Sequence, residues 1–333
     1  MNQKSIYDEM EANKGGFIMN QYQEEIAVSV DQLVAKDHKY RLFKRLVKFD
    51  KLIAVMKLPA NVMGPNGFGN DRLVMCILLE FIEDLSYRMH DRFLKENVAA
   101  KWFCGFGLLE KTPDYSTLSK FVTKVGLERL QKLFEEMRRQ LKEAGYLMEE
   151  LTFIDASALI SKLQMWEERD NAIADGEEKL NNKNIEKYTS DKDVRIGAKS
   201  KKKYWFGFKR SRSVDMKSRM INKVSVTYAN VTDADAGECV LPSKGSVFGD
   251  KGYVPLIPKI WQKGLLPRVI LKDNMKKKNE EKDRIISKKR CPHEATFTRT
   301  SNRTRFRGLE KNNMIEILLA FGVNMNRWAV LAG

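Results

Sequence analysis

The stretch LTFIDASALI, residues 151–160, marks the change from a helical to a strand pattern in this sequence. It is short and apolar and lacks the three-to-four spacing of a helix, so it predicts a buried β-strand. Asp155 stands inside this strand. Burial of a lone carboxylate is costly unless it meets an opposite charge or a metal. Asp155 therefore requires either a buried arginine or a bound cation.

The sequence after this strand predicts a mixed α/β domain. Further short, β-prone stretches predict strands at residues 204–213, 224–232, 246–250 and 268–272. Helical or irregular segments are expected between and after them, at residues 161–203, 254–264 and 309–328. Three strands followed by a strand, a helix, a strand and a terminal helix are the order of a ribonuclease-H-like sheet with helices packed on it.

The sequence before residue 151 predicts an all-helical domain. Apolar residues recur at helical spacing in three stretches, at 42–49, 73–85 and 127–141. Gly145 is expected to end the last of these helices. The Pro- and Gly-rich stretch 59–70 separates the first helix from the second, with Asn70 or Asp71 as the expected N-cap.

These patterns divide the chain into three parts. Residues 1–30 show no clear period and predict a flexible N-terminal arm. Residues 31–147 form the predicted helical N-terminal domain. Residues 148–333 form the predicted ribonuclease-H-like domain, which contains Asp155.

The positive charge is concentrated in two segments. The formal net charge is +16, yet Lys199 to Lys223 holds ten Lys and Arg against one acid, and Asn274 to Lys311 holds thirteen against five. Two basic segments in an otherwise nearly neutral chain indicate a polyanionic partner, because Lys and Arg release the counterions condensed on phosphates. The ordinary alternative is a solvated basic surface.

The cysteines and the apolar stretches indicate a cytoplasmic protein. The four cysteines form no CxxC pair and have no zinc-ligand spacing, which disfavours a disulfide framework or a zinc finger. The most apolar stretch, LVMCILLEFI from Leu73, contains Glu80 and is too short to span a bilayer. The N-terminus has no signal pattern, so no membrane partner is expected.

Two further acids could act with Asp155. Asp250 ends the predicted strand SVFGD and enters the turn KGY, which is where α/β proteins place functional groups. Glu294 follows KKRCPH and is expected in the first turn of a helix, with Pro292 near its start. Three carboxylates suit a hard cation such as Mg²⁺. The ordinary alternatives are a turn cap for the aspartate and a helix-dipole contact for the glutamate.

Three blocks of the sequence carry a family resemblance: FIDAS at 153–157, VFGDKGY at 247–253 and RCPHEATFTRTSNRTRFRGLEKN at 290–312. They resemble the acidic blocks of DDE-type bacterial insertion-sequence transposases, in the insertion sequence four/five superfamily. The stretch 112–126 resembles the end of that group's helical N-terminal domain. A related signature of this group consists of a tyrosine, an arginine, a glutamate and a lysine. The chain has two of these four residues, Arg290 and Glu294. The other two positions hold Ser287 and Ser301, which leaves the subgroup open.

The resemblance implies a DNA transposase whose catalytic and metal-binding acids are Asp155, Asp250 and Glu294. It implies two Mg²⁺ ions, with Mn²⁺ as a substitute, that support cleavage at the ends of a mobile element and joining to target DNA. The implied partners are double-stranded DNA, as terminal inverted repeats and as target, and further copies of the chain in a homo-oligomer on DNA. The helical domain is the implied DNA-end-binding part, and the implied location is the bacterial cytoplasm, in association with the nucleoid.

Four basic residues are candidates for phosphate contacts near the acids: Lys251, Arg290, Arg305 and Arg307. Each has a surface role unrelated to DNA as its alternative. Two other functions also remain open. One is a catalytically silent DNA-binding protein derived from a transposase, and the other is a ribonuclease-H-like nuclease without strand transfer.

Overall fold

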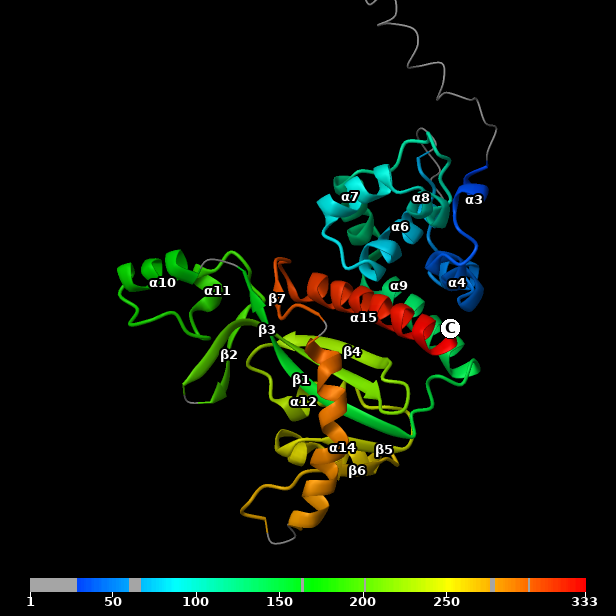
Figure 1. Ribbon diagram of the computed structural model, residues 1–333. Coiled ribbons are helices and arrows are strands. Elements are labelled where there is room, and N and C mark those ends of the chain that lie inside the picture. The colour runs from blue at the N-terminus through cyan, green and yellow to red at the C-terminus, as the bar shows by residue number, and fades with distance from the viewer. Residues whose placement is uncertain (1–28, 60–66, 163–164, 201, 276–278, 299) are drawn as a thin grey trace, which may run out of the picture.

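The computed structural model describes residues 29–59, 67–162, 165–200, 202–275, 279–298 and 300–333 (Figure 1). Helices occupy the N-terminal part of the chain, and a seven-stranded mixed sheet with further helices forms the rest. The predicted α/β class is therefore confirmed. The predicted flexible arm, residues 1–30, lies almost wholly outside the described residues.

The described helices before the sheet are α3 (Val30–Leu33), α4 (Lys39–Leu46), α5 (Phe49–Ala54), α6 (Asn70–Ile82), α7 (Tyr87–Glu96), α8 (Val98–Cys104) and α9 (Tyr115–Glu143). The helical pattern predicted for this part is confirmed. Gly145 follows α9 with a φ of 76°, and its amide donates to the carbonyl of Lys142 at 3.0 Å. A residue without Cβ takes this left-handed conformation at little cost, which is why the helix ends here.

The N-cap predicted for α6 is wrong. Gly69, with a φ of 81°, occupies the cap position, and no side chain caps this helix. Asn70 instead donates its side-chain amide to the carbonyl of Pro59 at 2.9 Å, across the loop that leads into the helix. The amide of Asn70 therefore closes the base of the loop.

The strands are β1 (Leu151–Ser161), β2 (Arg195–Ser200), β3 (Lys203–Asp215), β4 (Ile221–Tyr228), β5 (Ser246–Gly249), β6 (Leu266–Val269) and β7 (Arg303–Thr304). β1 is central, because it pairs antiparallel with β3 and parallel with β5. β4 adds to β3 antiparallel, and β6 adds to β5 parallel. This order and these directions are those of a ribonuclease-H-like sheet.

The strands predicted at 151–160, 204–213 and 246–250 are confirmed. β4 and β6 each begin and end a few residues earlier than the strands predicted at 224–232 and 268–272. β4 ends at Tyr228 because the amide of Val231 turns back onto the Tyr228 carbonyl at 3.1 Å. β2 was predicted only as part of an irregular or helical segment. It has little apolar pattern of its own, and its pairing with β3 makes it a strand.

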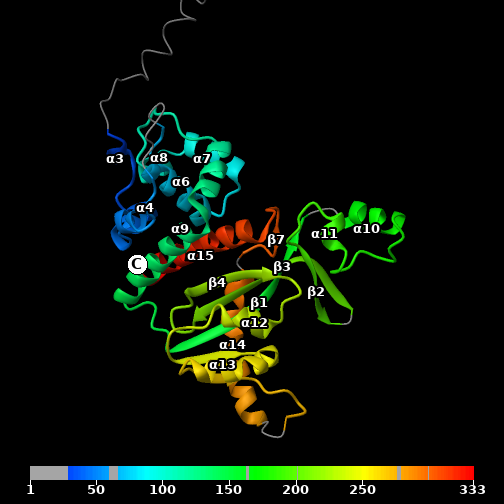
Figure 2. The same ribbon diagram turned by 180° about the vertical axis from the view of Figure 1, so that it is seen from behind.

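The remaining helices are α10 (Met165–Ala174), α11 (Ile185–Tyr188), α12 (Asp233–Glu238), η1 (Lys251–Leu256), α13 (Ile257–Gln262), α14 (Glu280–Thr298) and α15 (Leu309–Ala332). α10 and α11 project from the sheet together with β2 (Figures 1 and 2). η1 and α13 form the helical connection predicted between β5 and β6. α15 confirms the predicted terminal helix.

Apolar layers cover both faces of the sheet. Phe153 and Phe248 point to one face, where they join Ile286 of α14 and residues of α15 and the N-terminal helices in one core. Ile154 and Val247 point to the other face and pack with α12, η1 and α13. Successive side chains of a strand alternate between the two faces, so β1 is buried on both.

α15 joins the helical part of the chain to the sheet. It lies between the N-terminal helices and the sheet (Figures 1 and 2), in contact with α6, α9 and β4. By length and composition α15 could cross a membrane, but most of its apolar stretch is buried in this core. The division of the chain at residues 147 and 148 stays a prediction, because the largest apolar core includes residues from both sides of it.

Glu80 of α6 is a buried acid close to this junction. Its side chain is 2% exposed, and one carboxylate oxygen has no hydrogen-bond partner among the described residues. Burial raises the pKa of Glu80 to about 8, against the opposing effect of the Arg305 and Lys311 charges. Glu80 is therefore protonated in the folded chain at a pH where it is ionised in the unfolded chain.

Gly322 allows α15 to approach α6. A Cβ at this position would lie 2.1 Å from the backbone carbonyl oxygen of Phe81. Gly322→Ala should therefore separate the two helices and lower the free energy of unfolding by about 2 kcal/mol, measured by chemical denaturation. Gly107→Ala is the control, because its Cβ would meet nothing closer than 3.7 Å. Equal stability of the two variants would contradict this packing.

Glu80→Gln should change how stability depends on pH. The folded pKa of about 8 exceeds the unfolded value near 4.5, so the wild-type protein loses stability as pH rises between these values. The variant should match the wild type at pH 5 and exceed it by on the order of 2 kcal/mol at pH 8. Thermal unfolding across this range tests it, with the exposed Glu96→Gln in α7 as control. Parallel pH profiles for wild type and Glu80→Gln would refute the burial effect.

Candidate active site

The register of β1 and β5 brings two of the predicted acids together. The two strands are parallel, with Phe153 paired to Phe248. Continuation of this register by two residues sets Asp155 level with Asp250, where β5 ends. Both aspartates are partly exposed. Asp155 and Asp250 thus stand level on adjacent parallel strands, where β5 ends and the turn after SVFGD begins.

Short backbone contacts orient both carboxylates. Oδ1 of Asp155 accepts a hydrogen bond from the amide of Ala156 at 2.9 Å. Oδ1 of Asp250 accepts from the amide of Gly252 at 2.9 Å, which makes Asp250 the N-cap of η1. Asp250 therefore caps η1, as its ordinary alternative predicts, and also stands level with Asp155.

Tyr253 is a buried residue of η1, the helical turn that Asp250 caps. Its ring packs tightly against α12 and the end of β5, since a Cβ on Gly237 or Gly249 would come within 2.6 or 3.0 Å of ring atoms. The residue is 1% exposed, and its hydroxyl has no hydrogen-bond partner among the described residues. Burial, and after it the carboxylates of Asp155, Asp233 and Asp250, raise the pKa of Tyr253 well above its usual value. The three carboxylates therefore act electrostatically on the buried phenol.

Glu294 lies on α14, but not where the sequence predicted. α14 begins at Glu280, Pro292 lies inside it, and Glu294 stands near its C-terminal end instead of in its first turn. The start lies earlier because the Asn279 carboxamide accepts from the Lys282 amide at 2.9 Å, a capping contact. The first turn is also acidic, which suits the positive end of the helix dipole.

α14 crosses the face of β1 that carries Phe153 and Asp155. The guanidinium of Arg290 lies 5.2 Å from the centre of the Phe153 ring, and the ring of the buried His293 lies 6.3 Å from it. The backbone of Glu294 follows directly after His293, on the same side of the sheet. The side chain of Glu294 is outside the described part of the structure.

The structure brings only some of the predicted basic residues to the acids. Lys251 follows Asp250 directly and pairs with Asp273 at 2.9 Å. Arg290 lies close enough to Tyr253 to act on its pKa. Arg305 instead lies over the rings of Tyr87 and Phe306, at 5.9 and 5.4 Å.

β7 explains why Arg305 and Arg307 are not beside the acids. It pairs with the far end of β1, where Arg303 is level with Ile160, and it runs parallel to β1. The chain after β7 therefore continues away from Asp155. Arg305 and Arg307 are close to Glu294 in the sequence, but this closeness does not place them near it in space. The direction of the chain after α14 depends on the pairing of β7 with β1.

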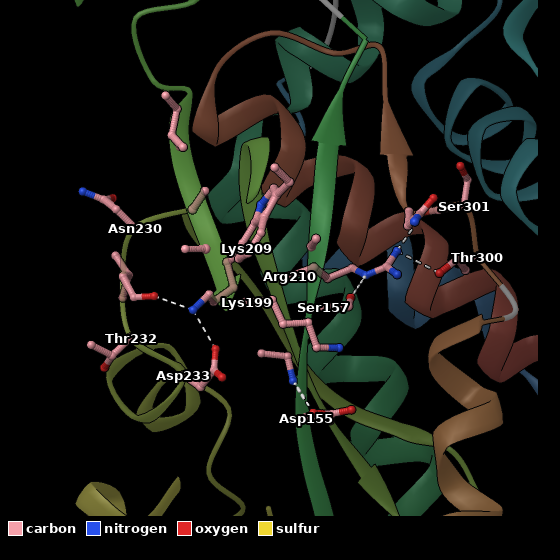
Figure 3. Close-up of a pocket in the computed structure, with 18 residues that line it drawn as sticks. Asp155, Ser157, Lys199, Lys209, Arg210, Asn230, Thr232, Asp233, Thr300 and Ser301 are labelled. Carbon is pink, nitrogen blue, oxygen red and sulfur yellow. Dashed lines mark hydrogen bonds and ion pairs between the residues drawn. The ribbon is translucent and has the colours of Figure 1, made fainter. Parts of the chain in front are cut away.

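A cleft of about 1030 Å³ opens beside Asp155 (Figure 3). Its walls come from β1, from the β2–β3 ribbon, from the turn after β4 and from the segment after α14, and include Asp155, Lys199, Trp205, Lys209, Asp233 and Ser301. Lys209 donates to Asp233 at 2.6 Å within this cleft. The sequence pattern missed Lys209, Asp233 and Tyr253, because a basic residue in a strand and an acid in a turn have common structural uses.

A buried ionic cluster lies behind the cleft. Arg210 and Arg212 of β3 both reach Glu316 of α15, and all three side chains are at most 2% exposed. Each arginine also donates to Oγ1 of Thr300 at 2.9 Å. Arg212 is the strand partner of Asp155. The cluster therefore ties the segment after α14 to the strand beside Asp155.

The donor chemistry of the site suits a divalent cation. Among the described residues no three His, Cys, Asp or Glu side chains stand close enough to form a complete metal site, and the Glu294 side chain is not in that set. Oδ1 of Asp250 and Oδ2 of Asp233 both lie close to Gly252, since a Cβ there would be 3.1 Å from the first and 3.2 Å from the second. Carboxylate oxygens are the ligands that Mg²⁺ prefers.

The order and directions of the strands in this sheet agree with the DDE class of enzymes. Two family models match the chain: Transposase domain (DUF772) over residues 28–124 and Transposase DDE domain over residues 179–320. The chain belongs to the DDE-type insertion-sequence transposases, which cut DNA. The second match includes Asp250 and Glu294, and Asp155 falls between the two matches. No curated protein and no solved structure is similar enough to be matched to the chain.

Glu316→Ala should destabilise the chain strongly. The substitution leaves two buried guanidinium groups without the carboxylate that both contact, and removal of one member of a buried ionic cluster costs about 3–5 kcal/mol. Chemical denaturation measures the effect. Glu310→Ala, at an exposed position of the same helix, is the control. A loss no greater than that of the control would mean that the cluster contributes little to the fold.

Proposed function

We propose that this transposase cuts the ends of a mobile element and joins them to target DNA at Asp155, Asp250 and Glu294, with two Mg²⁺ ions, for which Mn²⁺ can substitute. The observation that carries this proposal is the parallel register that sets Asp155, which lines the large cleft, level with Asp250. The course of α14 over Phe153 supports the third position, Glu294.

Each acid has its own role in this proposal. Asp155, on the central strand, would contribute to both cation sites, and Asp250 and Glu294 would each complete one of them. When bound, the cations activate the attacking hydroxyl and stabilise charge on the departing oxygen. Arg290 lies at the same site and is suited to contact a phosphate through its guanidinium. Lys251, directly after Asp250, is a second candidate for such a contact.

The chemistry consists of two phosphodiester displacements at the same acids. In the first, water attacks a phosphate at the end of the element, the bond to the 3′ oxygen breaks, and a 3′-hydroxyl is released. In the second, this hydroxyl attacks a phosphate of the target, and a target phosphodiester bond breaks as the new one forms. No covalent bond between the protein and DNA is required.

The remaining parts of the chain have roles in DNA binding. Residues 31–147 are the proposed DNA-end-binding domain, and residues 148–333 the proposed catalytic domain. The proposed partners are terminal inverted repeats, target DNA and further copies of the chain, which act together in the bacterial cytoplasm at the nucleoid. The net charge of +16 and its two basic segments support DNA as the partner. Arg305 and Arg307 are candidates for backbone contacts away from the acids.

Asp155→Asn, Asp250→Asn and Glu294→Gln should each lower Mg²⁺-dependent cutting of a labelled duplex bearing the terminal repeats by about 100-fold or more, because each removes a charged ligand. Binding of the duplex, measured by gel shift, should persist. Glu310→Gln is the control, since Glu310 is an exposed acid of α15 and is not among the proposed ligands.

Other outcomes would replace this proposal. Undiminished cutting by the three variants would show that the acids are wrongly assigned. A wild-type protein that binds the repeats and never cuts would be a silent DNA-binding protein. Cutting without joining to a target plasmid would identify a nuclease without strand transfer.

A further inference from the structure

A second cavity, the junction cavity, lies where the N-terminal helices meet the sheet. Its volume is about 220 Å³, and its walls come from α6, the end of β1, β7 and the first half of α15. Ser301, which lines the large cleft (Figure 3), also lines the junction cavity, so the two adjoin. Arg210 holds this dividing segment, since its guanidinium donates to the carbonyl of Ser301 at 3.1 Å.

Three basic side chains line the junction cavity without an acidic partner. Lys162, Arg303 and Arg305 are all exposed, and none of them forms an ion pair within the described part of the chain. Positive charges gathered around one space repel one another unless an anion lies between them. A cavity of this size holds several waters at about 30 Å³ each, so a phosphate group fits.

Arg305 is held in place by contacts that leave its donors available. Its guanidinium lies 5.9 Å from the centre of the Tyr87 ring and 5.4 Å from that of Phe306, and these two rings meet edge to face at 6.1 Å. Cation–π contacts act through the face of a ring and need no N–H group. A guanidinium fixed in this way can donate two parallel hydrogen bonds to a phosphate.

The acids of the junction cavity leave room for an anion. Glu80 is buried with one oxygen unpartnered among the described residues, and its pKa of about 8, raised by burial, keeps it uncharged at neutral pH. A protonated carboxyl can donate to a phosphate oxygen. Glu316 is already paired with Arg210 and Arg212. Asp84, at an exposed position, is the remaining acid among the described lining residues.

We propose that the junction cavity binds a backbone phosphate of the DNA whose cleaved bond lies at the acids. Arg303 is level with Ile160, five residues after Asp155 on β1, which is about 17 Å at about 3.3 Å per residue. Each base pair of a duplex rises about 3.4 Å, so the bound phosphate lies about five base-pair steps from the cleaved bond. The inference rests on the proposed function, because it names a further contact of the same substrate.

This contact would set the register of the DNA on the whole chain. The junction cavity is lined both by α6 of the helical part and by strands of the sheet. A phosphate held there is fixed relative to both parts, at a set distance from the acids. Arg305 and Arg303 are therefore positioning residues and not catalytic ones.

Binding of a labelled duplex that bears the terminal repeats tests the contact. Fluorescence anisotropy in EDTA at several salt concentrations measures it without the cations. Arg305→Gln and Arg303→Gln should each weaken binding by about tenfold. Each should also reduce the slope of log affinity against log salt by about one, because one fewer phosphate charge is neutralised. Lys263→Gln, an exposed lysine after α13 next to the edge strand β6, is the control and should change neither quantity.

Single methylphosphonate substitutions in the duplex locate the phosphate. This group removes the charge of one phosphate, so at the contacted position it should weaken wild-type binding by about tenfold. The same substitution should weaken binding by Arg305→Gln much less, since the contact is already absent. The position is expected about five base-pair steps from the cleaved bond. Equal losses for the wild type and Arg305→Gln at every position would overturn the inference.

Arg303→Gln keeps the test decisive if Arg305→Gln does not fold, which circular dichroism would show. Arg303 is exposed and forms no ion pair within the described residues, so its substitution should leave the fold intact. If folded Arg303→Gln has the affinity and salt slope of Lys263→Gln, the inference is wrong.

Inorganic phosphate distinguishes DNA from a free anion as the ligand. Thermal unfolding of the wild type and of Arg305→Gln is compared with and without phosphate. Stabilisation by phosphate that the substitution abolishes, together with unchanged binding of the duplex, would assign the cavity to a free anion and overturn the DNA contact.

The failure of this inference differs from the failure of the proposed function. A wild-type protein that binds the repeats through Arg305 and never cuts would retain the phosphate contact and remove the catalytic acids. Cutting that Asp155→Asn abolishes, together with wild-type binding by Arg305→Gln and Arg303→Gln, would retain the acids and exclude only the contact in the junction cavity.

Discussion

Strand β1 pairs on both of its edges, and the rest of the structure depends on this double pairing. Its antiparallel partner β3 carries Arg210 and Arg212, and its parallel partner β5 ends at Asp250. Because Phe153 and Ile154 are buried on opposite faces, a shift by one residue would exchange the two apolar layers. The burial of β1 therefore fixes the register that sets Asp155 beside Asp250.

The charges around this strand are arranged in two groups. Asp155 stands level with Asp250 on the neighbouring parallel strand, and Asp233 lines the cleft beside Asp155 with one oxygen held by Lys209. Behind them, Arg210 and Arg212 share Glu316, which holds α15 and the segment after α14 to β3. A buried ionic cluster of this kind contributes mainly to a specific arrangement of elements, since desolvation offsets much of its Coulomb energy.

The sequence predicted which helices and strands form more accurately than it predicted the residues at which they begin and end. The strands at Asp155 and before Asp250 were correct because their apolar runs are local signals. The predicted start of α14 is wrong. Pro292 predicts a helix that begins near it, whereas the cap at Asn279 starts the helix earlier. β2 was missed because an edge strand can be stabilised by its pairing more than by its own composition.

What the sequence by itself determined is the class of fold, the basic character of the chain, the position of Asp155 inside a strand and that of Asp250 at the end of another. These follow from side-chain periodicity and from composition, which act over a few residues. Only the tertiary structure decided that Asp233 lines the same cleft as Asp155, that Tyr253 is buried, and that Arg305 lies over the ring of Tyr87. Each of these depends on strand pairing between distant segments, which no local pattern specifies.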